Sequence, residues 1–175
     1  LLRSAASKTR DNDGATYPQH LLAQKLQTIA KLIDSPLKTR VYYVTLDGFD
    51  THAQQAGAHE SLLGKLSSAL AAFVADLKQR HQGQRVTTMV FSEFGRRLAE
   101  NASKGTDHGA AGPMFLAGER ILPGLIGKHP SLTDLQQGDL KHQFDFRQVY
   151  ASILQWMGWE ATALGKSFKP LELFT

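Results

Sequence analysis

Three short polar segments of the chain hold side chains that can bind a metal ion or transfer protons. The groups are Asp47, Asp50, His52, Glu93, Asp107 and His108. Four carboxylates and two imidazoles on neighbouring loops would repel one another or compete unless a cation bound them. A divalent metal ion is the simplest explanation, and this mixture of oxygen and imidazole ligands fits Zn, Mn or Fe(II) better than Ca.

Further polar residues in the same segments have two interpretations each. Thr51 and Thr106 either orient the metal ligands or bind substrate. Arg96 either forms an ion pair with Glu93 or holds an anionic group through its guanidinium fork. Asp107 also suits a capped turn, so its type alone does not decide its role.

Regular elements must position these segments. Apolar residues at helical spacing predict one helix between Pro18 and Pro36, a longer one over residues 58–80, and a last one with Asp145 as its N-cap. The predicted strands are rich in β-branched and aromatic residues and cover 40–46, 85–91 and 113–117. We interpret this order as an α/β fold with a mainly parallel sheet, because the helix over 58–80 is long enough for a parallel crossover.

The polar segments fall at the ends of the predicted strands. Residues 47–52 follow the first strand and residues 92–96 follow the second, so parallel strands would bring both loops to one edge of the sheet. Residues 105–109 precede the third strand, and the glycines at both ends of this segment allow the backbone to pass close to a ligand. We therefore expect the candidate groups to meet at that edge.

Length and composition limit the class of protein. With 175 residues, of which 42% are hydrophobic and 21% charged, the chain has the make-up of one globular domain. No stretch approaches the ~20 apolar residues of a membrane-spanning helix. The net charge of +4 is scattered, unlike the clustered basic stripe of a nucleic-acid interface. The absence of Cys excludes disulfides, thiolate metal ligands and Cys nucleophiles.

Five short motifs occur in an order that resembles a known family. They are Gly-Phe-Asp-Thr-His-x-x-Gln (48–55), Ser-Glu-Phe-Gly-Arg (92–96), Glu-Asn (100–101), Gly-Thr-Asp-His-Gly (105–109) and Asp-Phe-Arg-x-Val-Tyr (145–150). With them, the chain closely resembles the C-terminal part of the bacterial family called domain of unknown function 1501, which is grouped with the alkaline phosphatase and sulfatase superfamily. The resemblance runs from about Tyr17 to Phe168.

The resemblance implies a fold, a setting and an incomplete chain. It implies a three-layer α/β/α, alkaline phosphatase-like fold with a metal site at the strand ends. Residues 17–175 would be the C-terminal part of one such domain, and residues 1–16 a loose arm or truncated connection. The superfamily's nucleophile would lie in a missing N-terminal half. The resemblance also implies an exported, periplasmic protein.

The superfamily's metal ligands carry over unevenly. Asp50, His52 and His108 match the ligands of the first metal ion, although the Asp-x-His spacing is shorter than usual. The second ion normally uses a Ser-Asp-His-Gly segment, and here Glu93 can replace the Asp whereas Phe94 cannot replace the His. The second site would be lost or rebuilt with Asp107. In an alternative alignment, Asp107 and His108 form the Asp-His pair and Glu93 supports it. The first alignment is preferred because residues 92–95 follow a clear strand.

Two functional hypotheses follow from the residues and the resemblance. The leading one is a metal-dependent hydrolase of phosphate or sulfate esters that holds one or two Zn, Mn or Fe ions. Arg96, Thr51 and Thr106 would bind the anionic ester. The isolated chain would then be inactive, and it would dimerise or bind its missing half through an exposed sheet edge. The alternative is a non-catalytic exported binding or assembly protein that retains the fold and a partial metal site.

Overall fold

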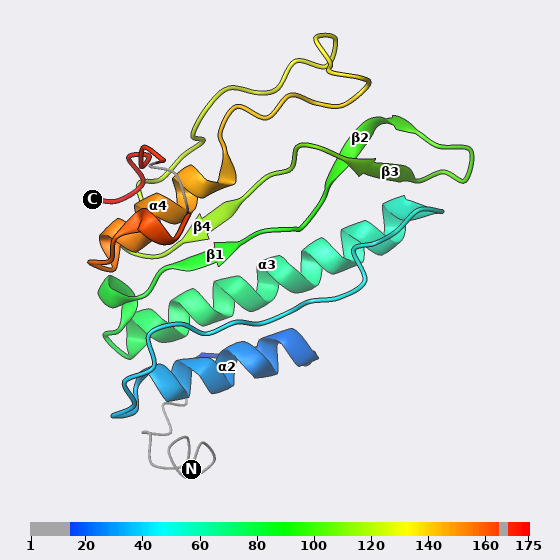
Figure 1. Ribbon diagram of the computed structural model, residues 1–175. Helices are drawn as coiled ribbons and strands as arrows, with labels where there is room; N and C mark the ends of the chain where they lie inside the picture. Colours follow the sequence, from blue (N-terminus) through cyan, green and yellow to red (C-terminus); the bar gives the residue numbers. More distant parts are fainter. Residues whose placement is uncertain (1–14, 165–167) are drawn as a thin grey trace. The chain divides into compact units, whose positions relative to one another are not determined.

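A computed structural model describes residues 15–164 and 168–175 (Figure 1), so the predicted N-terminal arm over residues 1–16 falls almost wholly outside the described residues. The described helices are α2 (Leu21–Ile33), α3 (Gln55–Gln79) and α4 (Phe146–Trp156), with short 3-10 helices at Gly83–Arg85 and Ala161–Leu164. The described strands are β1 (Thr88–Val90), β2 (Gly95–Glu100), β3 (Thr106–Gly109) and β4 (Phe115–Ala117). None of the described helices is long and apolar enough to cross a membrane.

The chain divides into two compact units. The first contains the described residues up to Thr88, together with Glu100–Thr106 and Ala117–Glu119. The second contains Met89–Ala99, Asp107–Leu116 and the described residues from Arg120 onward. Each unit therefore combines segments that are far apart in the sequence.

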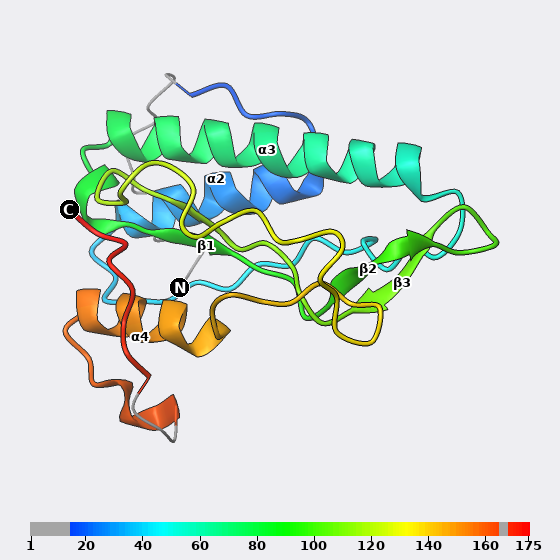
Figure 2. The same cartoon turned by 90° about the horizontal axis from the view of Figure 1, so that it is seen from above.

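The core of the first unit lies between α2 and α3, which run side by side (Figure 1, Figure 2). Leu22 and Leu26 of α2 are buried against Phe73 and Leu77 of α3, and Ala69 is fully buried between the helices. These side chains recur every three or four residues, so each helix presents one apolar face to the other. Both helices confirm the sequence prediction, although α3 begins three residues earlier than the predicted 58.

A buried polar network joins the two helices. The Tyr17 hydroxyl donates to Asp76 Oδ2 at 2.9 Å, and Arg80 Nε donates to Asp76 Oδ1 at 2.8 Å. Arg80 also donates to Asp34 Oδ2 at 3.2 Å. Asp76 is 1% exposed, so its charge depends on these donors for compensation. Burial, followed by the hydrogen bond to Asp76, raises the pKa of Tyr17 above its usual value.

The segment over residues 40–46, predicted as a strand, has an extended course (Figure 1) but forms no strand with the described residues. Its side chains still alternate as in a strand. Tyr42, Val44 and Leu46 pack against the helical core, whereas Val41 and Tyr43 are 62% and 76% exposed. The apolar alternation therefore sets the side-chain faces, and the strand itself is missing because no neighbouring strand accepts its backbone hydrogen bonds.

The four strands form two small antiparallel sheets. β1 pairs with β4, and these strands lie within the predicted strands 85–91 and 113–117. β2 pairs with β3 in a hairpin that the sequence did not predict. No parallel pairing occurs among the described residues. The predicted parallel sheet and the three-layer, alkaline phosphatase-like fold are neither confirmed nor refuted, and they stay predictions.

Helix α4 begins as the sequence predicted, with Asp145 as its N-cap. The Asp145 carboxylate accepts from the backbone N–H of Arg147 at 2.9 Å, and Gln148 completes a capping box. Hydrogen bonds from the Arg147 side chain and backbone lower the pKa of Asp145 to about 2. The conspicuous Asp-Phe-Arg motif at 145–147 thus has a structural role at the start of this helix.

Candidate metal site

Asp50 and His52 form the centre of the candidate site in the first unit. His52 Nε2 and Asp50 Oδ1 lie 2.9 Å apart, and the two side chains are 46% and 66% exposed, respectively. They lie in the irregular segment between the extended residues 40–46 and α3, after a turn at Gly48 with φ +102°. The Nε2 atom of His52 and the Oδ1 atom of Asp50 therefore face each other on a solvent-accessible loop.

A second loop of the same unit holds the His52 segment in place. Asn101 Nδ2 donates to the carbonyl oxygen of His52 at 3.0 Å. The backbone N–H groups of Gln54 and Gln55 donate to the carbonyl oxygens of Ser103 and Lys104, at 2.9 and 3.0 Å. Three hydrogen bonds thus fix the chain directly after His52, and we call residues 101–105 the clamp loop.

Gly105 allows the closest approach between these two segments. A Cβ atom at this position would lie 2.4 Å from the carbonyl carbon and oxygen of His52, a distance that no side chain tolerates. The glycine was predicted to let the backbone pass close to a ligand. In the structure it lets the backbone pass close to the loop that carries His52, and the approach to a ligand stays a prediction.

The side chain of Gln55 joins two predicted substrate-binding residues. Its Nε2 donates to Thr51 Oγ1 at 3.0 Å, and the Thr106 hydroxyl donates to its Oε1 at 2.9 Å. Of the two interpretations of Thr51 and Thr106, this arrangement favours orientation of the loops, because both hydroxyls are engaged in holding them together.

The alternation of side chains along a strand directs Asp107 and His108 to opposite faces of β3. Both are exposed and adjacent in β3, so their side chains leave opposite faces of the strand. They are poorly placed to bind one ion together, which disfavours the alternative alignment. His108 instead shares a face of β3 with Thr106, two residues earlier.

In the second unit, His108 belongs to a stack of flat side chains. The ring of Phe94 lies parallel to the His108 imidazole, with centroids 4.0 Å apart and planes at 5°. Arg96 lies over the Phe94 ring at 5.2 Å from its centroid. Glu93 is exposed and makes no hydrogen bond or ion pair with any residue in the described ranges, so the predicted pairing with Arg96 is not formed there. Phe94 cannot bind a metal ion, but its ring orients the imidazole of His108, which can.

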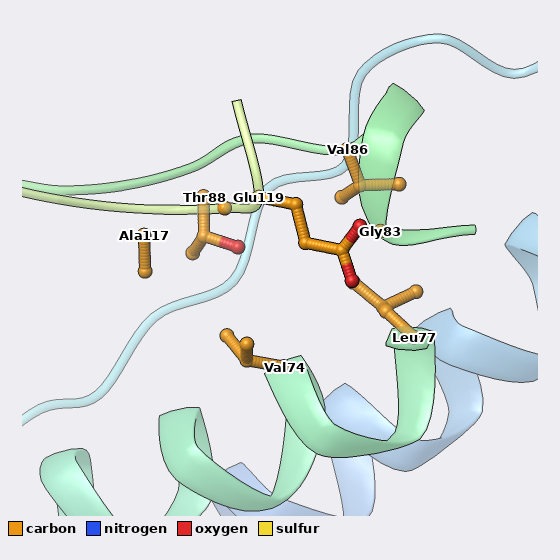
Figure 3. Close-up of a pocket in the computed structure, with 8 residues that line it drawn as sticks. Val74, Leu77, Gly83, Val86, Thr88, Ala117 and Glu119 are labelled. Atoms are coloured by element: carbon orange, nitrogen blue, oxygen red, sulfur yellow. The ribbon is translucent and has the colours of Figure 1, made fainter. Parts of the chain in front are cut away.

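A small cavity in the first unit, between α3 and the chain around β1, is not a binding site. Leu77, Val86 and the carboxylate of Glu119 surround it (Figure 3). Its volume of about 10 Å³ leaves room for no more than a single water molecule. The carboxylate of Glu119 is already hydrogen-bonded, because Gln84 Nε2 donates to its Oε2 at 2.7 Å.

Sequence reasoning missed two residues that organise the site. Asn101 and Gln55 belong to the motifs quoted above, but neither carries chemistry of its own. The available signal was the run Asn-Ala-Ser-Lys-Gly at 101–105, whose Asn and Gly are typical of a tight turn.

Comparison with known proteins identifies a family. No curated protein and no solved structure matches the chain. Residues 2–172, nearly the whole chain, match the family described as "Protein of unknown function (DUF1501)". That description names no reaction, ligand or partner. The chain belongs to the DUF1501 family.

Proposed function

We propose that the chain binds a divalent metal ion through Asp50, His52 and His108, and that this ion serves the hydrolysis of phosphate or sulfate esters. Each of the three residues offers one ligand atom, and all three are exposed. The observation that carries the proposal is the Asp50–His52 pair on a loop fixed by three hydrogen bonds.

The pair fits a metal ion in both chemistry and spacing. Zn–N and Zn–O bonds of ~2.1 Å in a tetrahedron place neighbouring ligand atoms ~3.4 Å apart. The present separation of 2.9 Å between His52 Nε2 and Asp50 Oδ1 would have to widen by only about half an ångström. Exposed side chains can make such a movement without disturbing a core.

His108 is the third ligand in this proposal. It follows Thr106 by two residues on the same face of β3, a step of ~7 Å along a strand. Thr106 is itself hydrogen-bonded to Gln55, three residues after His52. Chain connectivity and strand alternation therefore support His108 as a ligand. Three protein ligands would leave the open position typical of a catalytic site.

The remaining polar residues receive roles toward the ester. Arg96 would bind the anionic group through its guanidinium fork. Glu93 and Asp107 would supply oxygen ligands to a second ion or accept hydrogen bonds from the ligand imidazoles. When bound, the metal would polarise the ester and favour deprotonation of an attacking hydroxyl. In this proposal, no residue of this chain is assigned as the nucleophile.

Metal analysis tests the binding part of the proposal. The full chain, purified without chelators or a metal column, is expected to contain about one equivalent of Zn, Mn or Fe, and up to two if the second site is built. His52→Ala and His108→Ala should each lower the affinity of the apoprotein for Zn(II) or Mn(II) by more than about 100-fold, because loss of a group that only supports a metal ligand already costs about 10–100-fold. His129→Ala is the matched control, because His129 is exposed and, among the described residues, its side chain hydrogen-bonds only to the carbonyl oxygen of Pro130. A wild-type chain that binds no metal, or a His52→Ala variant with unchanged affinity, would overturn the proposal.

The stacked Phe94 favours a second candidate function. Phe94 packs face to face on His108. If the superfamily resemblance holds, Phe94 takes the place of a His ligand of the second metal ion and leaves fewer ligands for a two-metal reaction. This is compatible with an exported, periplasmic binding or assembly protein that keeps one metal ion. Aryl phosphate, sulfate and phosphonate esters, offered to the metal-loaded chain and to any longer natural polypeptide containing it, separate the two functions. Turnover that His52→Ala abolishes supports the hydrolase, whereas metal binding without turnover supports the second candidate.

A further inference from the structure

The extended segment over residues 41–46 offers its backbone to another strand. In the described part of the chain, the backbone groups of residues 41–46 receive one hydrogen bond, from Lys25 Nζ to the carbonyl oxygen of Thr45 at 3.3 Å. Nothing described donates to their other carbonyl oxygens or accepts from their N–H groups. An extended segment with free backbone groups is a template for pairing with a strand from another chain.

The side chains of this segment lack the usual protection of a free strand edge. Natural edges carry Lys, Pro or a bulge to prevent association. Residues 41–46 are Val-Tyr-Tyr-Val-Thr-Leu, without charge or Pro, and Val41 and Tyr43 are largely exposed. An open groove of about 350 Å³ runs between the segment and α2, lined by Lys25, Thr28, Ile29, Tyr43, Val44 and Thr45. There is thus both an exposed apolar face and open space beside it.

We propose that residues 41–45 pair with the same residues of a second copy of this chain, antiparallel and centred on Tyr43. In this register Val41 lies opposite Thr45, Tyr42 opposite Val44, and Tyr43 opposite its own counterpart. The two-fold symmetry makes one surface complementary to itself.

The alternation of the side chains supports this register. Residues directly opposite each other in an antiparallel pair point to the same side of the sheet. Odd-numbered residues, which are exposed, then face odd-numbered residues. Tyr42 and Val44, which pack on the core, face each other across the two copies. A shift by one residue would place buried side chains opposite exposed ones.

Charge at the two ends of the segment favours the antiparallel direction. Lys38 precedes the segment and Asp47 follows its end. An antiparallel pair brings the basic end of each copy to the acidic end of the other, whereas a parallel pair would bring like charges together. The second copy is thus a better occupant than a strand of arbitrary sequence.

The absence of Cys from the chain allows a direct test of the register. In the full chain, Tyr43→Cys should form an intermolecular disulfide under mild oxidation, because opposite Cβ atoms in an antiparallel pair lie ~5 Å apart. Val41→Cys and Thr45→Cys should each cross-link poorly alone and efficiently when mixed. Leu125→Cys is the control, since Leu125 is 81% exposed and lies in the second unit. Cross-linking of Tyr43→Cys no faster than that of Leu125→Cys would overturn the proposal.

The oligomeric state provides a second test of the proposed pairing, after the cross-linking. Light scattering of the unmodified chain is expected to give twice the monomer mass, falling to the monomer mass for Tyr43→Lys and unchanged for Leu125→Lys. Circular dichroism checks that both variants remain folded, and a Val41→Lys variant replaces Tyr43→Lys if that one unfolds. A monomer at every concentration refutes the pairing. Neither test involves the metal site, so the outcome is independent of the proposed function.

Discussion

Replacing Asn101 by Ala should weaken metal binding although Asn101 is not a proposed ligand. The Asn101 side chain makes three hydrogen bonds: Nδ2 donates to the His52 carbonyl oxygen at 3.0 Å, and Oδ1 accepts from the N–H groups of Ser103 and Gly105 at 3.0 and 3.1 Å. The first bond orients the segment that carries His52, and the other two shape the clamp loop. Ala at this position removes all three.

The expected magnitudes follow from these bonds. Each hydrogen bond contributes roughly 0.5–1.5 kcal/mol to the free energy of unfolding, so the Ala variant should lose about 1.5–4.5 kcal/mol. Loss of a group that orients a metal ligand typically lowers metal affinity by about 10–100-fold. Urea unfolding of the apoprotein measures the first quantity, and calorimetric titration with Zn(II) below the unfolding transition measures the second.

Asn101→Asp separates the two effects. The Asp carboxylate can still accept from Ser103 and Gly105, but it cannot donate to the His52 carbonyl oxygen. Its stability loss should be the smaller, about 0.5–1.5 kcal/mol. Its added negative charge favours cations, so weaker Zn(II) binding would have to come from the lost orientation. Ser131→Ala, which removes two comparable side-chain-to-backbone bonds in the second unit, is the control. Unchanged Zn(II) affinity in a folded Asn101→Ala variant would refute the reasoning.

Three further predictions concern the buried network and the aromatic stack. Arg80→Leu should lower the free energy of unfolding by about 3–5 kcal/mol in urea titrations, because it leaves the buried Asp76 carboxylate without its cation; a loss under about 1 kcal/mol would contradict this. The raised pKa of Tyr17 means that its hydroxyl stabilises the fold fully below the usual tyrosine pKa of about 10, and that this contribution is lost as the pH rises above it. Tyr17→Phe should therefore cost about 1.5–3 kcal/mol near neutral pH and flatten the alkaline decline of stability. Phe94→Leu should weaken Zn(II) binding by about 10-fold while Phe94→Tyr retains it, and equal affinities in the two variants would count against the orienting role.

The sequence predicted the helices well because their signals are local. The apolar spacing that includes Leu22 and Leu26 gives one helix an apolar face. Burying that face required only a second helix, which is α3. Asp145 was recognised as an N-cap because its acceptor satisfies N–H groups two and three residues away. Such signals depend on near neighbours in the chain, so a single sequence is sufficient to read them.

The sequence indicated which side chains could bind a metal ion, but it did not indicate which residues hold their loop in place. Asp50, His52 and His108 stand out by residue type, and their assignment to a metal stays a prediction. The clamp that Asn101 provides joins residues 49 positions apart, and no local pattern reports that contact. The β2–β3 hairpin was missed for a related reason. Its first strand is Gly-Arg-Arg-Leu-Ala-Glu, which has no β-branched or aromatic residue, so the turn chemistry of Asn101 outweighs weak strand propensity.

The segment over residues 40–46 shows which property of a strand is local and which is not. Alternation of side chains depends only on an extended backbone and one apolar surface, and here Tyr42, Val44 and Leu46 find that surface on the helices. A ladder of hydrogen bonds requires a second strand, which the described chain does not provide at this position. If a second copy supplies it, the strand prediction is correct for the assembly. The disulfide formed by Tyr43→Cys would then report whether the missing partner is this same sequence.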